Sequence, residues 1–218
     1  MTDFIDENGT WVEIRCDLDG NKFAGAPALF LDRDGAMVEE VLYLHKAEEM
    51  RLVLGAIQTI STANSIGIPV IVVTNQAGIG RGYYDWPDFC AVQEVMLKEL
   101  ETMGAVIDAV FACPYHAIGK GPYVAENHPD RKPNPGMLLK AREILSIDLH
   151  QSWIAGDRAT DLGAGHAAKC AGGVHLKTGH GSNDGETETA IKYRSDDFQV
   201  LIGQSIADLP DLIPFFQL

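Results

Sequence analysis

The segment ALFLDRDG, residues 28–35, joins four consecutive apolar residues to two carboxylates and a glycine. A short run of apolar residues is typical of a strand that is covered on both faces, as strands of a parallel sheet are. Gly35 permits a sharp turn directly after this strand, and the turn would bring Asp34 over Asp32. The segment therefore predicts a buried strand whose carboxyl end carries two acidic side chains.

The same alternation of apolar runs and helical patterns continues along the chain. Apolar runs that predict further strands occupy residues 69–73, 105–112, 152–155 and 172–176. Repeats of three or four residues between apolar positions predict helices at 54–66, 86–103, 135–145 and 161–169. This order predicts an α/β fold with an open, doubly wound, mainly parallel sheet, which binds its ligands beyond the carboxyl ends of the strands.

Two segments do not follow this alternation. Residues 1–26 are expected to be an N-terminal extension, in which TWVEIRC at 10–16 is an edge strand or half of a small hairpin. Residues 179–189, GHGSNDGETET, are polar and rich in glycine, and they predict a mobile loop. The remainder, residues 27–218, is predicted to be a single domain.

The composition excludes several classes of function. Seventeen basic residues against 31 acidic ones give a net charge of −14, which argues against general binding to nucleic acid or anionic lipid. No apolar run approaches the roughly 20 residues that a membrane-spanning helix needs. The four cysteines are far apart and the start of the chain has no apolar signal core, so we expect a cytoplasmic protein.

Polar side chains also follow two of the other predicted strands. Thr74 and Asn75 come after the run at 69–73, and their hydroxyl and amide groups can hydrogen-bond phosphoryl oxygens. Asp157 and Asp161 follow the run at 152–155, and clustered carboxylates of this kind suit Mg²⁺. Taken singly, the threonine could serve a local turn and each aspartate could cap a helix.

A basic pair, Arg131 and Lys132, precedes a proline, which favours extended geometry at Lys132. The planar guanidinium of Arg131 suits phosphate, although such a pair taken alone fits a solvated turn. The acidic, hydroxyl and basic signals all lie at the carboxyl ends of predicted strands or in the loops that follow them. Together they predict one site, with a divalent cation among acidic side chains and a phosphoryl group bound by Thr74 and Lys132. The acidic side chains are Asp32, Asp34 and Asp157.

Six segments in this order, FLDRDG, VVTNQAGIGRG, CPYH, RKPNPGMLLKAREIL, GDRATD and LKTG, resemble the motif set of the haloacid dehalogenase superfamily. The resemblance covers about residues 27–178. Within the superfamily, the combination is similar to the branch of D-glycero-D-manno-heptose 1,7-bisphosphate phosphatases and histidinol-phosphatases. It implies a Mg²⁺-dependent phosphomonoester hydrolase that acts on a small phosphorylated metabolite, such as heptose 1,7-bisphosphate.

The resemblance also implies a role for each matched residue. Asp32 would be the nucleophile, and Asp34 the general acid and then the general base. Thr74 and Lys132 would bind the phosphoryl group. The metal ligands would be Asp32, Asp34 through its backbone carbonyl, and Asp157.

The spacing of the motifs leaves little room for an inserted cap domain. Asp32 and Thr74 are 42 positions apart, and Thr74 and Lys132 are 58 positions apart. A loop at residues 113–131 is therefore expected to cover the site in a minimal-cap arrangement, and a monomer is a reasonable expectation. Asn75, Arg81 and Arg131 stand at positions that the family uses for substrate contacts.

The chain departs from this branch in the loop at 113–131. Relatives there commonly hold a structural zinc with a C-x-H pair followed by a C-x-C pair, whereas this chain has Cys113, Tyr115, His128 and Asp130. A rearranged zinc site could use His116 in place of Tyr115, since all four side chains can then bind zinc. The alternative is a loop without metal that is shaped by the packing of its prolines and tyrosines.

Three other functions remain open on the sequence. The substrate could be histidinol phosphate. The same nucleophile could hydrolyse a carbon–halogen bond, although a halide leaving group does not need the acid that Asp34 supplies. The chain could also be a phosphometabolite-binding protein without catalytic activity.

Overall fold

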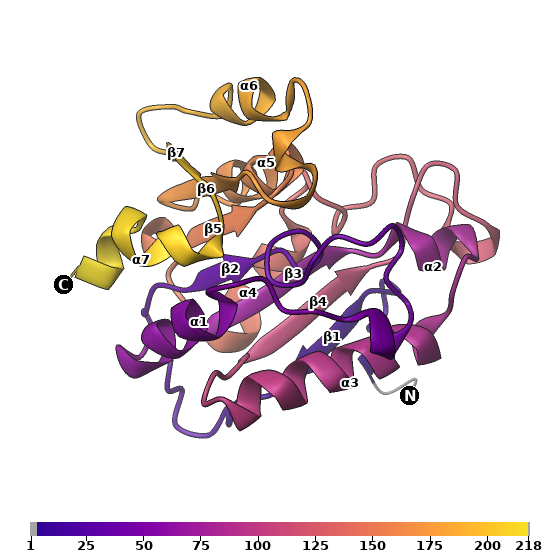
Figure 1. Cartoon of the computed structure of the whole chain (residues 1–218), viewed down its shortest axis with the longest axis horizontal. Helices are drawn as coiled ribbons and strands as arrows, with labels where there is room; N and C mark the ends of the chain where they lie inside the picture. Colours follow the sequence, from indigo (N-terminus) through magenta and orange to yellow (C-terminus); the bar gives the residue numbers. More distant parts are fainter. Residues whose placement is uncertain (1–3, 218) are drawn as a thin grey trace.

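A sheet of seven strands runs through residues 4–217, which are the residues that the computed structural model describes (Figure 1). The strands lie in the order β1-β4-β3-β2-β5-β6-β7, and only the β1–β4 pair is antiparallel. Their bounds are β1 (Trp11–Ile14), β2 (Leu29–Leu31), β3 (Val70–Asn75), β4 (Ala109–Cys113), β5 (Trp153–Gly156), β6 (Gly172–Leu176) and β7 (Gln199–Gly203). The predicted α/β fold with a mainly parallel sheet is confirmed.

Helices cover both faces of this sheet, as in a doubly wound fold (Figure 1). On one face, α1 (Ala56–Ser65), α3 (Trp86–Thr102) and α7 (Leu209–Leu212) pack on one set of strand side chains. On the other face, α4 (Gly136–Leu145), α5 (Ala159–Ala167) and α6 (Glu186–Ile191) pack on the alternate set. All residues of β2, and all of β3 except its last residue, Asn75, are buried because each face of the strand meets a helical layer.

The connections around β2 place the carboxyl ends of three strands side by side. Leu31, the last residue of β2, pairs with Val72 of β3 on one side and with Ala155 of β5 on the other. The chain from β2 to β3 passes over one face through α1, and the chain into β5 arrives from α4 on the opposite face. The strand order therefore reverses at β2, and in open α/β sheets ligands bind at such a point.

Several sequence-based expectations need adjustment. The strand expected at 105–112 begins only at Ala109, because the Asp108 side chain accepts a hydrogen bond from the Val70 amide there. Three further elements, α2 (Ala77–Arg81), the edge strand β7 and α7, are not among those expected from the sequence. The expected strand within residues 10–16 is β1, which joins the edge of the main sheet.

The prediction of a mobile loop at residues 179–189 is wrong. This segment contains a short 3₁₀ helix, Gly179–Ser182, and most of α6. Its order comes from contacts distant in sequence. The backbone N–H of His180 donates to Asp157, and the Glu186 carboxylate accepts from the backbone N–H of Ala159 at the start of α5. A polar, glycine-rich composition could not reveal these tertiary bonds.

Within the described part of the chain, every helix is too short or too polar to cross a membrane.

Candidate active site

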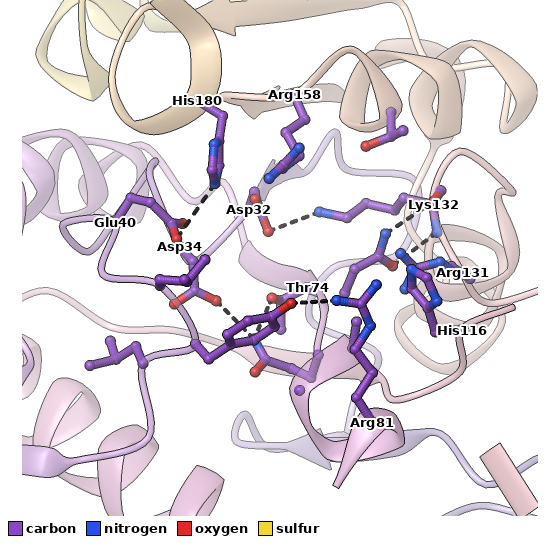
Figure 2. A pocket seen from close by; sticks show the side chains of 18 of the residues that line it. Asp32, Asp34, Glu40, Thr74, Arg81, His116, Arg131, Lys132, Arg158 and His180 are labelled. Carbon is purple, nitrogen blue, oxygen red and sulfur yellow. Dashed lines mark hydrogen bonds and ion pairs between the residues drawn. The ribbon is translucent and has the colours of Figure 1, made fainter. Parts of the chain in front are cut away.

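Acidic side chains and one threonine meet where β2, β3 and β5 end, and Figure 2 shows Asp32 and Thr74 among them. Asp32 follows β2 directly, and its backbone N–H donates to the Ala155 carbonyl, which continues the pairing with β5. Thr74 is the penultimate residue of β3, and Asp157 follows β5 directly. The parallel register thus brings together side chains that are distant in the sequence.

Lys132 reaches these strand ends from the loop before α4. Its ammonium group donates to Asp32 Oδ1 at 2.9 Å and to the Val73 carbonyl at 2.7 Å, and it also pairs with Asp161. Burial alone would lower the pKa of Lys132, but the two carboxylates raise the pKa above its ordinary value. Asn75 fixes the backbone of Lys132 by two hydrogen bonds of 3.0 Å, one to its carbonyl and one from its N–H.

The carboxylates of Asp32, Asp157 and Asp161 form the group in the described residues whose oxygens lie within 4.8 Å of one another. Burial, together with the nearby charges of Asp32 and Asp161, raises the pKa of Asp157 to about 8. The pKa of Asp32 is raised to about 6 by burial, despite the opposing effect of Lys132. Lys132 alone does not balance the charge of three carboxylates, so the group has the chemistry of a site for a hard divalent cation.

Two features around Asp157 support this interpretation. Its Oδ1 is buried and has no hydrogen-bond partner within residues 4–217, whereas Oδ2 accepts from the backbone N–H of His180 at 2.7 Å. Gly35 and Gly179 both have positive φ angles and lie against this carboxylate, so that a Cβ atom at either position would overlap with it. The chain thus keeps side chains away from a carboxylate that has one oxygen free to bind a cation.

Asp34 does not belong to this group of three carboxylates, and its side chain has its own partners. Its oxygens accept from Nε and Nη2 of Arg33 at 2.9–3.2 Å and from Nε2 of Gln76 at 2.8 Å. Gln76 also donates to the hydroxyl of Thr74 at 2.8 Å. Arg33 is fully buried, with its guanidinium 5.1 Å from the ring centre of Phe89. The network links the proposed acid to the proposed phosphoryl ligand.

Beyond these groups, a pocket of about 340 Å³ opens toward solvent. Three guanidinium groups line it, those of Arg81, Arg131 and Arg158. Arg131 donates to the Tyr115 carbonyl at 2.8 Å, and Arg81 donates to the Tyr43 hydroxyl. Burial and the other two arginines lower the pKa of Arg131. The pocket is therefore suited to an anion larger than a single phosphoryl group.

A second acidic group faces the pocket from the loop after β2. Glu40 lies 3.5 Å from His180 Nε2, and Figure 2 shows this pair beside Arg158. Burial raises the pKa of Glu40 to about 7, with added repulsion from Asp34 and Asp32.

The alternative zinc ligands do not converge on a common point. His116 lines the pocket and its Nδ1 accepts from the backbone N–H of Ile118 at 3.1 Å. The carboxylate of Asp130 is engaged by Thr10 and Lys140. Cys113 lies 3.9 Å from His128, and burial raises the pKa of its thiol to about 12, which disfavours the thiolate that zinc would need.

The sequence motifs bring together most of these residues but give no site role to Gln76, Arg33 and Glu40. Asp161 is interpreted from the sequence either as a helix cap or as one of the clustered carboxylates that suit Mg²⁺. It does cap α5, by accepting from the backbone N–H of Arg158, and it also pairs with Lys132. Its spacing of four from Asp157 was the available signal. Gln76, Arg33 and Glu40 had no such signal, because their roles depend on the directions of side chains around the turn.

The comparisons with known proteins agree with this fold. A family model described as HAD-hydrolase-like matches residues 130–200. A heptose-1,7-bisphosphate 7-phosphatase of Mesorhizobium japonicum is 45% identical over 170 residues, covering 78% of this chain and 77% of the relative. A second one, from Pasteurella multocida, is 36% identical and covers 85% of this chain and 96% of the relative. Both are named for the β anomer of D-glycero-D-manno-heptose 1,7-bisphosphate.

Two solved structures extend the likeness. A protein of Mesorhizobium loti described as a HAD-like phosphatase is 37% identical, with a TM-score of 0.84 and coverage of 98% of this chain and 96% of that one. The D,D-heptose 1,7-bisphosphate phosphatase of B. bronchiseptica, solved with magnesium and phosphate, is 27% identical with a TM-score of 0.71. It covers 85% of this chain and 96% of its own.

Fold, site and relatives define a phosphomonoester hydrolase of the haloacid dehalogenase-like class. Within that class, the chain belongs to the family of the D-glycero-D-manno-heptose-1,7-bisphosphate 7-phosphatases. The resemblance stated from the sequence motifs is thus confirmed.

A substitution at Gly35, which lies against the Asp157 carboxylate, is a first test of the cation site. Gly35→Ala should lower the affinity for Mg²⁺ roughly 10–100-fold, the usual effect of disturbing a group that supports a metal ligand. Its Cβ would displace the Asp157 carboxylate. Titration calorimetry with Mg²⁺ measures the effect. Gly20→Ala is the matched control, because Gly20 has nearly the same φ (+80° against +83°) and no atom within 4 Å of the added Cβ. Equal Mg²⁺ affinity in both folded variants would contradict the assignment.

Proposed function

We propose that this protein is a Mg²⁺-dependent phosphatase that removes one phosphate from heptose 1,7-bisphosphate through an aspartyl-phosphate intermediate. The observation that carries the proposal is the convergence of Asp32, Asp157, Asp161 and Lys132 at the strand ends. The substrate follows the names of the relatives from M. japonicum and P. multocida. The cation follows the donor set and the magnesium with which the B. bronchiseptica enzyme was solved.

In this proposal, Mg²⁺ is held by the side chains of Asp32 and Asp157 and by the backbone carbonyl of Asp34, with Asp161 nearby. When bound, the cation offsets the repulsion between an anionic nucleophile and an anionic phosphoryl group. Lys132 adds a second positive charge at the same place. The orphaned Oδ1 of Asp157 supports this ligand set.

The first half of the reaction uses both aspartates of the DRDG turn. A carboxylate oxygen of Asp32 attacks phosphorus, and the bond between phosphorus and the sugar oxygen breaks. Asp34 donates a proton to that oxygen, so the sugar leaves as an alcohol. Thr74 and Lys132 hold the phosphoryl oxygens, and Gln76 keeps Asp34 beside Thr74.

The second half regenerates the enzyme. Asp34, now a carboxylate, takes a proton from a water molecule as the water oxygen attacks the phosphorus of the aspartyl phosphate. The bond between phosphorus and Asp32 breaks, and inorganic phosphate leaves. The ion pair with buried Arg33 holds the Asp34 side chain in place for this step.

The pocket charges favour a bisphosphate over histidinol phosphate. The guanidinium groups of Arg81, Arg131 and Arg158 exceed what one phosphoryl group needs, since Lys132 already serves that group. A second phosphate would be attracted to them, whereas the ammonium group of histidinol phosphate would be repelled. Asn75 is the remaining proposed substrate contact, although its side chain is engaged with the backbone of Lys132.

We further infer that the loop at 113–131 works without zinc. We also infer that the protein acts as a cytoplasmic monomer on a small metabolite, without nucleic acid or membrane as a partner. The net charge of −14 argues against nucleic acid and anionic lipid as partners, and the four free cysteines fit a cytoplasmic location. The loop is inferred to lack zinc because the alternative ligands do not converge. In this view residues 27–218 are the catalytic domain and residues 1–26 an extension to it.

A substrate panel tests the proposed function. Heptose 1,7-bisphosphate, in both anomeric forms, should have the highest kcat/KM, followed by sugar monophosphates, with histidinol phosphate lowest because of its ammonium group. Phosphate release should need Mg²⁺ and stop with a chelator. A preference for histidinol phosphate would overturn the choice of substrate, and release of halide without phosphate would overturn the reaction type.

The nucleophile is tested by Asp32→Asn. An amide cannot form the aspartyl phosphate, so turnover should fall by at least several powers of ten. Circular dichroism should show an intact fold, and Asp184→Asn, an exposed loop variant, should keep full activity. Residual activity of Asp32→Asn near that of the unmodified protein would rule out this nucleophile.

The double role of Asp34 is tested by Asp34→Asn with two leaving groups. With the sugar bisphosphate, kcat should fall roughly 10²–10⁴-fold, because the sugar oxygen leaves poorly without a proton. With p-nitrophenyl phosphate, whose leaving group needs no proton, rapid mixing should show a burst of about one equivalent of nitrophenolate followed by slow turnover. Equal loss on both substrates without a burst would contradict this assignment.

A further inference from the structure

A tight turn at residues 6–10 precedes β1 and lies against the substrate-covering loop. The Asp6 side chain accepts from the backbone N–H groups of Asn8 and Thr10 at 2.9 Å, which fixes the shape of the turn. Gly9, with φ +75°, lies so close to Tyr115 that a Cβ atom at this position would overlap with the tyrosine hydroxyl. The turn therefore packs directly on a residue of the loop at 113–131.

The same turn also binds the residue before Arg131. Asp130 is only 2% exposed, and its Oδ2 accepts from the Thr10 hydroxyl at 2.6 Å. Lys140 of α4 pairs with this carboxylate and with that of Asp6. One ammonium group thus joins the turn, the loop and α4. Gly136 completes the contact, because a Cβ there would overlap with Asp130.

Inside the loop, aromatic stacking joins the parts that the turn contacts. The rings of Tyr115 and His128 are stacked, with centroids 3.8 Å apart and planes 3° apart. His128 Nδ1 accepts from the backbone N–H of Asp130 at 3.2 Å. Three of the positions compared with zinc ligands, Tyr115, His128 and Asp130, are thus joined to one another by stacking and a hydrogen bond.

The two basic residues that follow Asp130 are held in different ways. Lys132 is fixed from the strand ends by Asp32, Asp161 and the Val73 carbonyl. For the Arg131 side chain, the described residues provide one hydrogen bond, from its guanidinium to the Tyr115 carbonyl. Two like charges, Arg81 and Arg158, line the same pocket and disfavour its position. Arg131 therefore depends on a fixed Tyr115 and a fixed Asp130.

We propose that the turn at residues 6–10 and Lys140 form an anchor that positions Arg131 for the non-reacting end of the substrate. Thr10, Asp6, Lys140 and Asp130 are positioning residues in this scheme. They act through Arg131 and touch neither the phosphoryl group nor the proposed cation ligands. The inference rests on the proposed function, because it assigns the anionic far end of a sugar bisphosphate to Arg131.

The test compares KM and kcat for two substrates in the full-length variants Thr10→Val and Lys140→Met. Both should raise KM for heptose 1,7-bisphosphate roughly tenfold, which corresponds to about 1.4 kcal/mol, and leave kcat nearly unchanged. KM for p-nitrophenyl phosphate should not change, because this substrate has no second anion. The variant Thr10→Ser, which keeps the hydroxyl group, should have the same KM for heptose 1,7-bisphosphate as the unmodified protein.

Arg15→Met is the matched control for general loosening of the N-terminal segment. Arg15 follows β1 and pairs with Glu13 and Glu101 rather than with the loop. The Arg15→Met variant should leave KM unchanged for both heptose 1,7-bisphosphate and p-nitrophenyl phosphate. A rise in KM with Arg15→Met as large as that with Thr10→Val would overturn the proposal. So would an equal loss of kcat on both substrates in the anchor variants, since that result would indicate an effect on Lys132.

A readout without substrate separates this inference from the proposed function. Hydrogen exchange of the amides at 113–131 should be faster in Thr10→Val and Lys140→Met than in the unmodified protein, while exchange at 153–157 stays the same. If heptose 1,7-bisphosphate is not hydrolysed but exchange changes in this way, the proposed substrate fails and the anchor stands. Unchanged exchange and unchanged KM in both variants would overturn the anchor itself.

Discussion

The buried ammonium group of Lys132 is the interaction on which the site depends. It contacts a carboxylate after β2, the carbonyl of Val73 in β3 and Asp161 at the start of α5, so it links the ends of three neighbouring strands. Burying this charge is tolerated only because opposite charges surround it, and removal of the ammonium group would leave the buried carboxylates of Asp32 and Asp161 without a counter-charge. The same ammonium offsets the repulsion between acidic side chains that would otherwise separate. Geometry and electrostatics of the centre are therefore set by the same contact.

Much of the fold and the centre of the site could be predicted from the sequence, for one physical reason. Carboxyl ends of adjacent parallel strands meet at one edge, so polar residues after apolar runs indicate a shared site before any coordinates are known. Asp32, Thr74 and Asp157 follow this rule. Lys132 follows it less directly, because only its extended context before a proline indicated that it could reach the strand ends.

The unpredicted parts depend on contacts that a linear pattern does not contain. Gln76 joins Asp34 to Thr74 only because the backbone turns after β3. The segment after β6 is ordered because a backbone N–H at residue 180 meets a carboxylate after β5. The polar, glycine-rich composition of residues 179–189 predicted a mobile loop instead. Composition reflects local conformational preferences and contains no information on partners distant in the sequence. The acidic excess of the chain likewise gave no indication that three guanidinium groups gather in one pocket.

The edge of the sheet at β1 has a consequence for the behaviour of the protein in concentrated solution. An exposed edge offers unpaired backbone groups to other chains and invites intermolecular pairing. Here the edge strand has four residues, carries Glu13, and is followed at once by Arg15, which pairs with Glu13 and with α3. A second strand would have to desolvate these charges to pair along β1. The segment that closes the sheet on this side thus also limits self-association through it.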